Sequence, residues 1–208
     1  MTTPLQAIGQ RHGTDKSVHN FKGVTYLDVY TQHIPPLVKC MVEIGVYKGA
    51  SLRTWREFFP FAEVWGVDID PEVKQGDPKV ITGSQADPNT ISQVAPGKEF
   101  DFVVDDGSHL VGHIIQSFEL IWPRVRSGGL YVVEDLLMTY IEDMSSTHRD
   151  SVAGISWPGQ KYNHLEECQN DRVKLNAFLL DLILKLDHGV GDVRSIQFYH
   201  QMVFFHKV

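Results

Sequence analysis

Two short apolar segments that each end in acidic residues place the strongest constraint on the fold of this chain. The first reads FVVDD and ends at Asp106, and the second reads LYVVED and ends at Asp135. The residues between them repeat apolar side chains at helical spacing from Val111 to Trp122. In a parallel α/β sheet, both acidic ends lie outside the carboxyl edge, where such folds place their chemistry. We therefore expect several carboxylates to converge there, together with a compensating cation.

The rest of the chain repeats this alternation of strands and helices. A turn at Gly128-Gly129 is expected to precede the second acidic strand. The pattern predicts an α/β fold: a Rossmann-like, doubly wound, mostly parallel sheet that ends in a C-terminal antiparallel hairpin. The predicted strands are 40–46, 64–70, 79–83, 100–105, 130–135, 193–199 and 202–208, and the main helices are 51–58, 111–122 and 175–186.

The length of 208 residues suits one domain with a substantial core. We divide this domain (1–208) into an N-terminal helical cap at 1–36, a cofactor- and metal-binding core at 37–135, and a terminal helix and hairpin at 171–208. Residues 136–170 lose periodicity directly after the acidic strand, which predicts a substrate lid. Its aromatic and imidazole side chains could stack on a substrate or simply pack the lid: Trp157, Tyr162 and His164.

Charge and composition exclude several kinds of partner. The net charge is −7 and no long basic run occurs, which argues against nucleic acid and anionic membrane surfaces. Cys40 and Cys168 form no motif, and this favours a reducing compartment. No apolar run approaches the roughly 20 residues of a membrane helix, and the N-terminus has no apolar signal region. We expect a cytoplasmic protein without a membrane partner.

A second candidate site is the strand-to-helix turn EIGVYKGAS, which runs from Glu43 to Ser51. Its glycines, Gly45 first, allow a tight turn and close approach to a ligand. It is not the G-x-G-x-x-G of a dinucleotide site, and a plain turn is the alternative. Asp68 ends the next strand, where an acid reaches ribose hydroxyls; Asp70 is the competing candidate, and a solvated turn carboxylate is the alternative. Gln85 and Asp87 follow the third strand and could meet an adenine edge or cap the next helix.

The carboxylates Asp106, Glu134 and Asp135 are the candidate metal ligands. An all-oxygen set favours a hard cation, Mg²⁺ first and Mn²⁺ or Ca²⁺ next, although two unrelated acidic strand ends would give the same sequence. His109 stands at the head of the following helix, where the helix dipole keeps an imidazole neutral, as a general base requires. The alternative is a helix residue without chemistry. His109 and His113 also have zinc-pair spacing, but the glutamate of a zincin helix is missing.

These motifs together resemble class I S-adenosylmethionine-dependent methyltransferases. The segments EIGVYKGAS, WGVDID, GSQADP, FVVDDGSH and SGGLYVVEDL, with GTDK near the N-terminus, look like those of the metal-dependent sugar O-methyltransferases of macrolide and tetracenomycin pathways, with cephalosporin hydroxylase-like proteins more distant. The resemblance implies S-adenosylmethionine and Mg²⁺ as cofactors. It assigns residues to the cofactor (Glu43, Gly45, Ser51, Asp68, Gln85, Asp87), to the metal (Asp106, Glu134, Asp135) and to catalysis (His109 as base, with Asp106).

The implied reaction is methyl transfer to a hydroxyl of a sugar or a glycosylated small molecule. The acceptor is left open, because the apolar Leu136-Leu137-Met138 stands where a polar start to the substrate loop is expected. The resemblance also suggests a homo-oligomer. A metal-dependent hydrolase, an NAD(P)-dependent oxidoreductase and a non-catalytic cofactor-binding protein are the alternatives on the same kind of fold.

Overall fold

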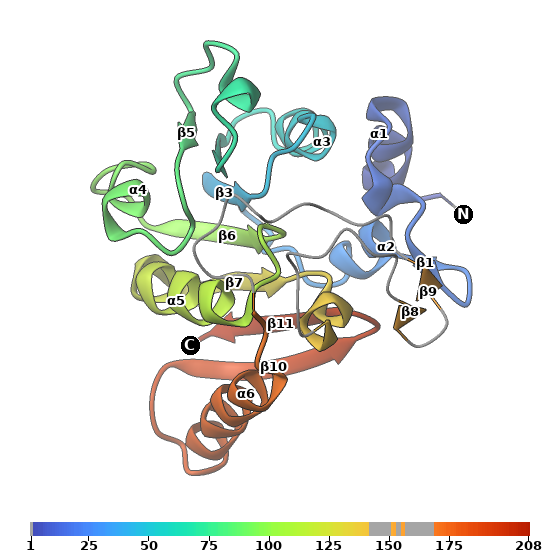
Figure 1. Ribbon diagram of the computed structural model, residues 1–208. Helices are drawn as coiled ribbons and strands as arrows, with labels where there is room; N and C mark the ends of the chain where they lie inside the picture. The colour runs from blue at the N-terminus through green and yellow to red at the C-terminus, as the bar shows by residue number, and fades with distance from the viewer. Residues whose placement is uncertain (1, 142–150, 153–154, 157–168) are drawn as a thin grey trace.

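The computed structural model describes residues 2–141, 151–152, 155–156 and 169–208. Its core is a seven-stranded sheet in the order β10-β11-β7-β6-β3-β4-β5 (Figure 1). Neighbours from β7 to β5 pair in parallel, whereas β11 runs antiparallel to both β7 and β10. The predicted doubly wound sheet with a C-terminal hairpin is thus confirmed. The strands are β3 (Cys40–Ile44), β4 (Glu63–Asp68), β5 (Val80–Thr82), β6 (Phe100–Asp105), β7 (Val125–Val133), β10 (Val193–Tyr199) and β11 (Met202–Lys207).

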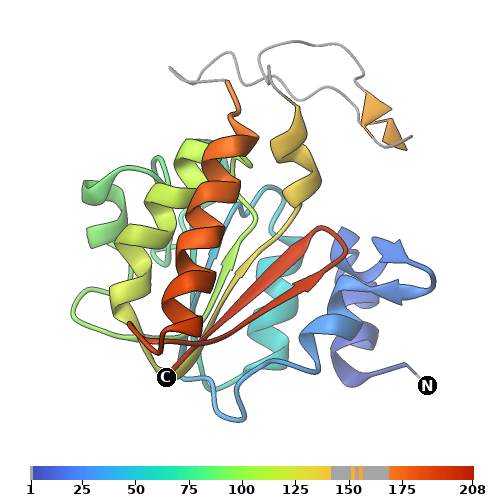
Figure 2. The same cartoon turned by 90° about the horizontal axis from the view of Figure 1, so that it is seen from below.

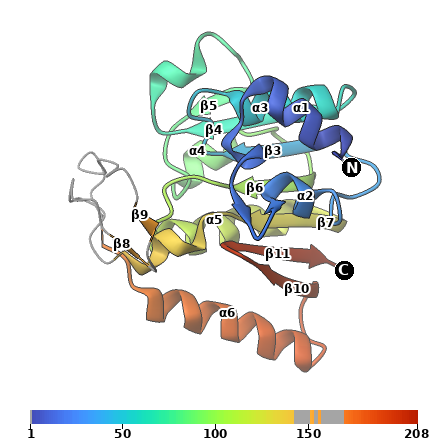
Figure 3. The ribbon, with the colours of Figure 1, turned by 90° about the vertical axis from the view of Figure 1, so that its right-hand side faces the viewer.

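Helices cover both faces of the sheet, as Figures 1 and 2 show. One face packs against α4 (Pro88–Ser92), α5 (Val111–Ile121) and α6 (Arg172–Asp187), and α6 lies along β10 at the edge of the sheet (Figure 3). The other face packs against α1 (Pro4–His12), α2 (Tyr26–Tyr30) and α3 (Ala50–Phe58). No helix within the described residues is long and apolar enough to cross a membrane.

The central strands β3 and β6 are mostly apolar because both of their faces are buried. Along β6, Val103 contributes to the core under α5, and Phe102 and Val104 contribute to the core under α2 and α3. This alternation follows from the two-residue period of a strand. A continuous apolar run is therefore the expected sequence of a strand between two helical layers.

Strand β7 begins earlier than the sequence suggested. We expected a turn at Gly128-Gly129, and this prediction is wrong, because the strand runs through both glycines. The pairing with β6 shifts register between Phe100 and Phe102, and Gly128 has a φ of 73°. A glycine inside a strand often marks a bulge, where the extra residue takes a backbone angle that favours glycine. The glycine pair therefore marks an irregularity inside the strand and does not end it.

The N-terminal segment folds as short helices and a two-stranded hairpin. After α1, the short helix η1 (Asp15–Ser17) precedes a hairpin of β1 (Asn20–Phe21) and β2 (Val24–Thr25), which leads into α2. Thr25 forms a capping box with Asp28 that fixes the start of α2. Leu5 and Leu27 are fully buried, so the segment is fastened to the domain core.

The chain after β7 turns into η4 (Leu136–Tyr140). Leu136 and Met138 are buried there, which accounts for apolar side chains where a polar loop was expected. Two short strands, β8 (Ser151–Val152) and β9 (Ile155–Ser156), pair with each other. The predicted lid residues Trp157, Tyr162 and His164 lie outside the described residues. The remaining short helices are η2 (Pro71–Lys74) and η3 (Trp122–Arg124).

Candidate metal and cofactor site

The acidic ends of β6 and β7 meet at one edge of the sheet. The strands pair in parallel with Asp105 opposite Val133, so Asp106 and Glu134 follow at equivalent positions. One ligand atom each from Asp106, His109 and Asp135 lie within 4.8 Å of one another. This juxtaposition brings together two predicted metal ligands and the predicted base.

The backbone around this cluster is unusual at two of its three members. His109 has a φ of 57° and Asp135 a φ of 52°, both in the left-handed region. Side chains other than glycine enter this region at a cost, and such residues gather at functional sites. Here the conformation directs both side chains toward the same small volume at the carboxyl edge of the sheet.

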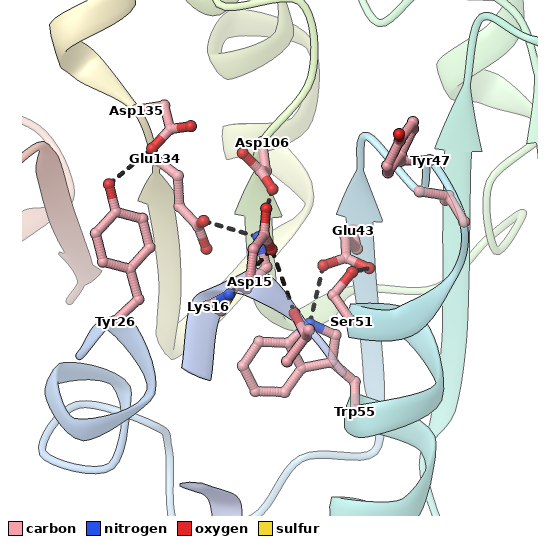
Figure 4. Close-up of polar contacts among 12 residues, drawn as sticks. Asp15, Lys16, Tyr26, Glu43, Tyr47, Ser51, Trp55, Asp106, Glu134 and Asp135 are labelled. Carbon is pink, nitrogen blue, oxygen red and sulfur yellow. Dashed lines mark hydrogen bonds and ion pairs between the residues drawn. The ribbon is translucent and has the colours of Figure 1, made fainter. Parts of the chain in front are cut away.

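A lysine from the N-terminal segment reaches into the carboxylates (Figure 4). Lys16, in η1, is 2% exposed, and its Nζ forms ion pairs with Asp106 and, at 2.7 Å, with Oε2 of Glu134. We expected a compensating cation at this cluster, and the structure supplies one from the protein itself. The role of Lys16 was missed in the sequence, where GTDK served only as part of a family resemblance.

Two tyrosines of α2 complete the surroundings of the carboxylates. Tyr26 Oη donates a hydrogen bond of 2.7 Å to Oδ1 of Asp135, and Tyr30 Oη donates to Oε1 of Glu134. Burial, reinforced by the nearby carboxylates, raises the pKa of both phenols. Both therefore stay protonated and act as donors. Their apolar neighbours in the sequence gave no sign of this role.

Burial and the neighbouring charges shift the pKa values of this cluster in opposite directions. Burial raises the pKa of Asp106 and Glu134, and the Lys16 cation counteracts this rise. Burial alone would lower the pKa of Lys16, but the carboxylates raise it well above its ordinary value. Lys16 is therefore held as a cation among the acids.

Glu134 differs from the other two predicted ligands. Its two carboxylate oxygens accept hydrogen bonds from Lys16 and from Tyr30, and the residue is 1% exposed. Asp106 and Asp135 are partly exposed and share the cluster with His109. The two carboxylates suit a hard divalent cation such as Mg²⁺ or Mn²⁺. Metal ligation by each residue stays a prediction.

Buried hydrogen bonds to Glu43 hold the turn that we predict to bind the cofactor. Glu43, at the end of β3, is fully buried and accepts hydrogen bonds from Ser51 Oγ at 2.8 Å and Trp55 Nε1 at 3.0 Å (Figure 4). Burial raises the pKa of Glu43 to about 7. Glu43 and Ser51 thus fasten the strand to the first turns of α3. A direct contact of either with a cofactor stays a prediction.

Asp68, at the end of β4, supports the same turn from the neighbouring strand. Its Oδ2 accepts hydrogen bonds of 2.8 Å from the backbone N–H groups of Val46 and Tyr47. Gly45, with a φ of 84°, lies between this turn and the backbone of Asp106. The turn from Glu43 to Ser51 (the cofactor turn) and the turn from Asp106 to His109 (the acidic turn) therefore pack directly against each other.

Gln85 and Asp87 occupy different environments. Gln85 is 5% exposed; its Nε2 donates to Oδ1 of Asp105 at 2.9 Å, and its Oε1 accepts from the Ser108 N–H at 2.8 Å. Asp87 caps α4 by accepting from the Asn89 N–H at 3.0 Å. The capping alternative is confirmed for Asp87. The polar ends of Gln85 hold the acidic turn, and an adenine contact for either residue stays a prediction.

Comparison with known proteins finds methyltransferases. Residues 42–136 match the family model described as a methyltransferase domain. The chain is 41% identical over 188 residues to mycinamicin VI 2''-O-methyltransferase of Micromonospora griseorubida, covering 80% of this chain and 43% of that protein. It is 37% identical over 150 residues to 8-demethyl-8-alpha-L-rhamnosyl tetracenomycin-C 2'-O-methyltransferase of Streptomyces olivaceus, covering 65% and 38%.

A solved structure shares the fold over nearly the whole chain. The MycE methyltransferase from the mycinamycin biosynthetic pathway, in complex with Mg, SAH and mycinamycin VI, has a TM-score of 0.71 and 28% sequence identity. The match covers 99% of this chain and 54% of that one. The chain thus spans about half of this structure and less than half of the two curated relatives.

Proposed function

Because this chain is a methyltransferase domain with the class I fold, we propose that it is an S-adenosylmethionine-dependent, Mg²⁺-dependent O-methyltransferase. The acceptor in this proposal is a hydroxyl of a sugar or of a glycosylated small molecule. One observation supports it above all: Asp106, His109 and Asp135 converge directly beside the turn that class I methyltransferases use for their cofactor. Both relatives named above are O-methyltransferases by name, one for mycinamicin VI and the other for a rhamnosyl tetracenomycin.

In this proposal the cofactor lies along the carboxyl edge of β3 and β4. Gly45 leaves the turn free of a side chain, and Asp68 offers a carboxylate for ribose hydroxyls while it holds the Val46 and Tyr47 N–H groups. The hydrogen bond from Ser51 to Glu43 keeps this turn in place. Gln85 and Asp87 follow β5, on the adenine side.

The proposed metal ligands are Asp106, Glu134 and Asp135. When bound, a hard divalent cation supplies Lewis-acid stabilisation to an oxygen that is losing its proton. His109 is the proposed base, because its imidazole lies beside Asp106 and Asp135 at the site where the acceptor hydroxyl must lose its proton. The rigid sheet edge contributes positioning, since the acceptor oxygen, the methyl carbon and the sulfur have to be aligned.

The test combines ligand binding with turnover. Calorimetry should show binding of S-adenosylhomocysteine and no binding of NAD⁺, which separates methyl transfer from hydride transfer and from hydrolysis. Methyl transfer to a panel of sugar glycosides should require Mg²⁺ and stop in excess EDTA. Full activity in EDTA would refute the metal dependence, and failure to bind S-adenosylhomocysteine would refute the proposal as a whole. Binding without metal-dependent transfer to any acceptor would point to a non-catalytic cofactor-binding protein.

Variants assign the roles within the cluster. His109→Ala and Asp106→Ala should each lower transfer by at least about 100-fold, the range for loss of a general base or of a charged catalytic group. Only Asp106→Ala should also abolish metal binding. His188→Ala, at an exposed position after α6, is the matched histidine control and should retain full activity. Loss of metal binding in His109→Ala would make this residue a ligand in place of a base.

A further inference from the structure

Lys16 is the one cation that the described residues place inside the carboxylate cluster. It belongs to η1, far in sequence from Asp106 and Glu134, and lies outside the segment that matches the methyltransferase family model. Its side chain is 2% exposed, so the ammonium is removed from water. A buried ammonium is strongly unfavourable unless carboxylates balance it. Lys16 can therefore occupy this buried position because Asp106 and Glu134 balance its charge.

The backbone holds Lys16 firmly in this position. Gln6 Nε2 donates a hydrogen bond of 2.7 Å to the carbonyl oxygen of Ser17, and Ser17 Oγ donates one of 2.6 Å to that of Thr14. The Lys16 N–H itself donates to Oδ1 of Asp15 at 2.9 Å. These hydrogen bonds fix the short helix η1, and the helix in turn positions the ammonium of Lys16.

The charges around Lys16 do not balance. Asp106, Glu134 and Asp135 carry three negative charges when ionised, and Lys16 supplies one positive charge. Tyr26 and Tyr30 donate hydrogen bonds without adding charge. The cluster thus retains attraction for a further cation, yet Lys16 already contacts Asp106, one of the groups that the cation would use.

We propose that Lys16 is a built-in counter-cation of this site, which stabilises the metal-free protein and competes with the divalent ion for Asp106. The inference rests on the proposed metal dependence. Lys16 keeps the acids together before the ion arrives, because without it three carboxylates would face one another across a buried volume. Once an ion binds at Asp106, the ammonium still pairs with Oε2 of Glu134, and Glu134 would reach the ion through its other oxygen, Oε1. Lys16 is thus a positioning residue that sets the metal affinity.

The competition has a distinctive consequence. A group that stabilises only the metal-free state lowers the apparent affinity for metal, by linkage. Removing the charge of Lys16 should therefore destabilise the metal-free protein and at the same time tighten metal binding. A residue with a merely structural role would weaken both. The direction of the change in metal affinity thus separates the two roles.

The experiment uses Lys16→Met, which keeps most of the side-chain volume and removes the charge, and Lys16→Arg, which keeps the charge. Lys22→Met, on an exposed lysine of the same segment, is the matched control. Calorimetry with Mn²⁺ and Mg²⁺ gives the affinity, and thermal melts with and without metal give the stabilisation. Lys16→Met should bind metal roughly tenfold more tightly than the unaltered protein and gain more stability from it. Lys22→Met should change the affinity by less than about threefold, and Lys16→Arg, which keeps the charge, should stay closer to the unaltered protein than Lys16→Met does.

The outcomes distinguish this inference from the proposed function. If the unaltered protein binds metal and Lys16→Met binds it equally or less tightly, the competition is refuted and the metal dependence stands. If the unaltered protein binds no divalent ion, the metal dependence itself fails. Should Lys16→Met not fold, the double variant with Asp106→Asn should recover part of the stability, because one of the carboxylate charges that Lys16 balanced is then gone. No recovery would refute the counter-cation role.

Discussion

Gly45 lies so close to Asp106 that a Cβ atom on the glycine would overlap the Asp106 carbonyl oxygen. This contact joins the turn after β3 to the turn after β6, which are the proposed cofactor and metal sites. Gly45 also has a φ of 84°, which other residues adopt at a cost. Two separate constraints thus require glycine at this position.

Gly45→Ala should therefore cost more than backbone strain alone. The matched control is Gly97→Ala, because Gly97 has a φ of 73° but has no heavy atom within 4 Å of the position of an added Cβ. We expect a loss of about 1 kcal/mol in the free energy of unfolding for Gly97→Ala and at least about 3 kcal/mol for Gly45→Ala. Urea unfolding measures both values. Equal losses would show that the contact with Asp106 relaxes without cost.

Glu43 should make stability depend on pH in the weakly acidic range. Burial raises its folded-state pKa from 4.5 to about 7, so between these values the folded protein binds more protons at this residue than the unfolded chain. Stability contributed by this residue is therefore lost as the pH rises from about 4.5 to 7, by about 3 kcal/mol in total.

The change that isolates this effect is Glu43→Gln, whose amide can still accept from Trp55 and donate to Ser51. Urea unfolding of both proteins from pH 4 to pH 8 gives the difference in unfolding free energy. This difference should shift in favour of the glutamine variant as the pH rises. A difference that stays constant with pH would mean that Glu43 titrates at its ordinary value.

Gln85 offers a test between a structural and a cofactor-binding role. Gln85→Leu removes a buried hydrogen bond to Asp105 and a partly buried one from the Ser108 N–H. It should lower the free energy of unfolding by about 2–4 kcal/mol, because the polar partners lose their bonds. Gln93→Leu, at an exposed position, should change it by less than about 0.5 kcal/mol.

The same variants should also be titrated with S-adenosylhomocysteine. If Gln85 has a structural role, Gln85→Leu should lower the free energy of unfolding. Any loss of affinity for S-adenosylhomocysteine should then be an indirect effect of the displaced acidic turn. Unchanged stability with a large loss of affinity would instead support the adenine contact that the sequence suggested.

Local sequence patterns predicted the fold well where they depend on burial. The runs 40–44 and 100–105 are mostly apolar because both faces of their strands are covered, and this pattern predicts buried strands from the sequence alone. The turn that we predicted at Gly128-Gly129 was wrong because the prediction also used only the local sequence. A glycine at a bulge and a glycine in a turn satisfy the same backbone requirement, and only the pairing with β6 distinguishes them.

The candidate site was predicted only in part. Asp106 and Asp135 were found because strand order brings the ends of neighbouring strands together. Lys16, Tyr26 and Tyr30 were missed, because their contacts with these acids span about 90 residues or more of sequence. No periodicity connects residues so far apart.

The sequence by itself determined where the main strands of the sheet lie, which strand ends carry acids, and where the turn from Glu43 to Ser51 lies. These properties depend on near neighbours and on burial, which a linear pattern records. Only the tertiary structure decided how the acids are balanced: Lys16 pairs with Asp106 and Glu134, and Asp135 is held by Tyr26. Electrostatic interactions act through space between segments that folding brings together. The cation that the acidic ends required was therefore already in the sequence, but its partners became known only from the fold.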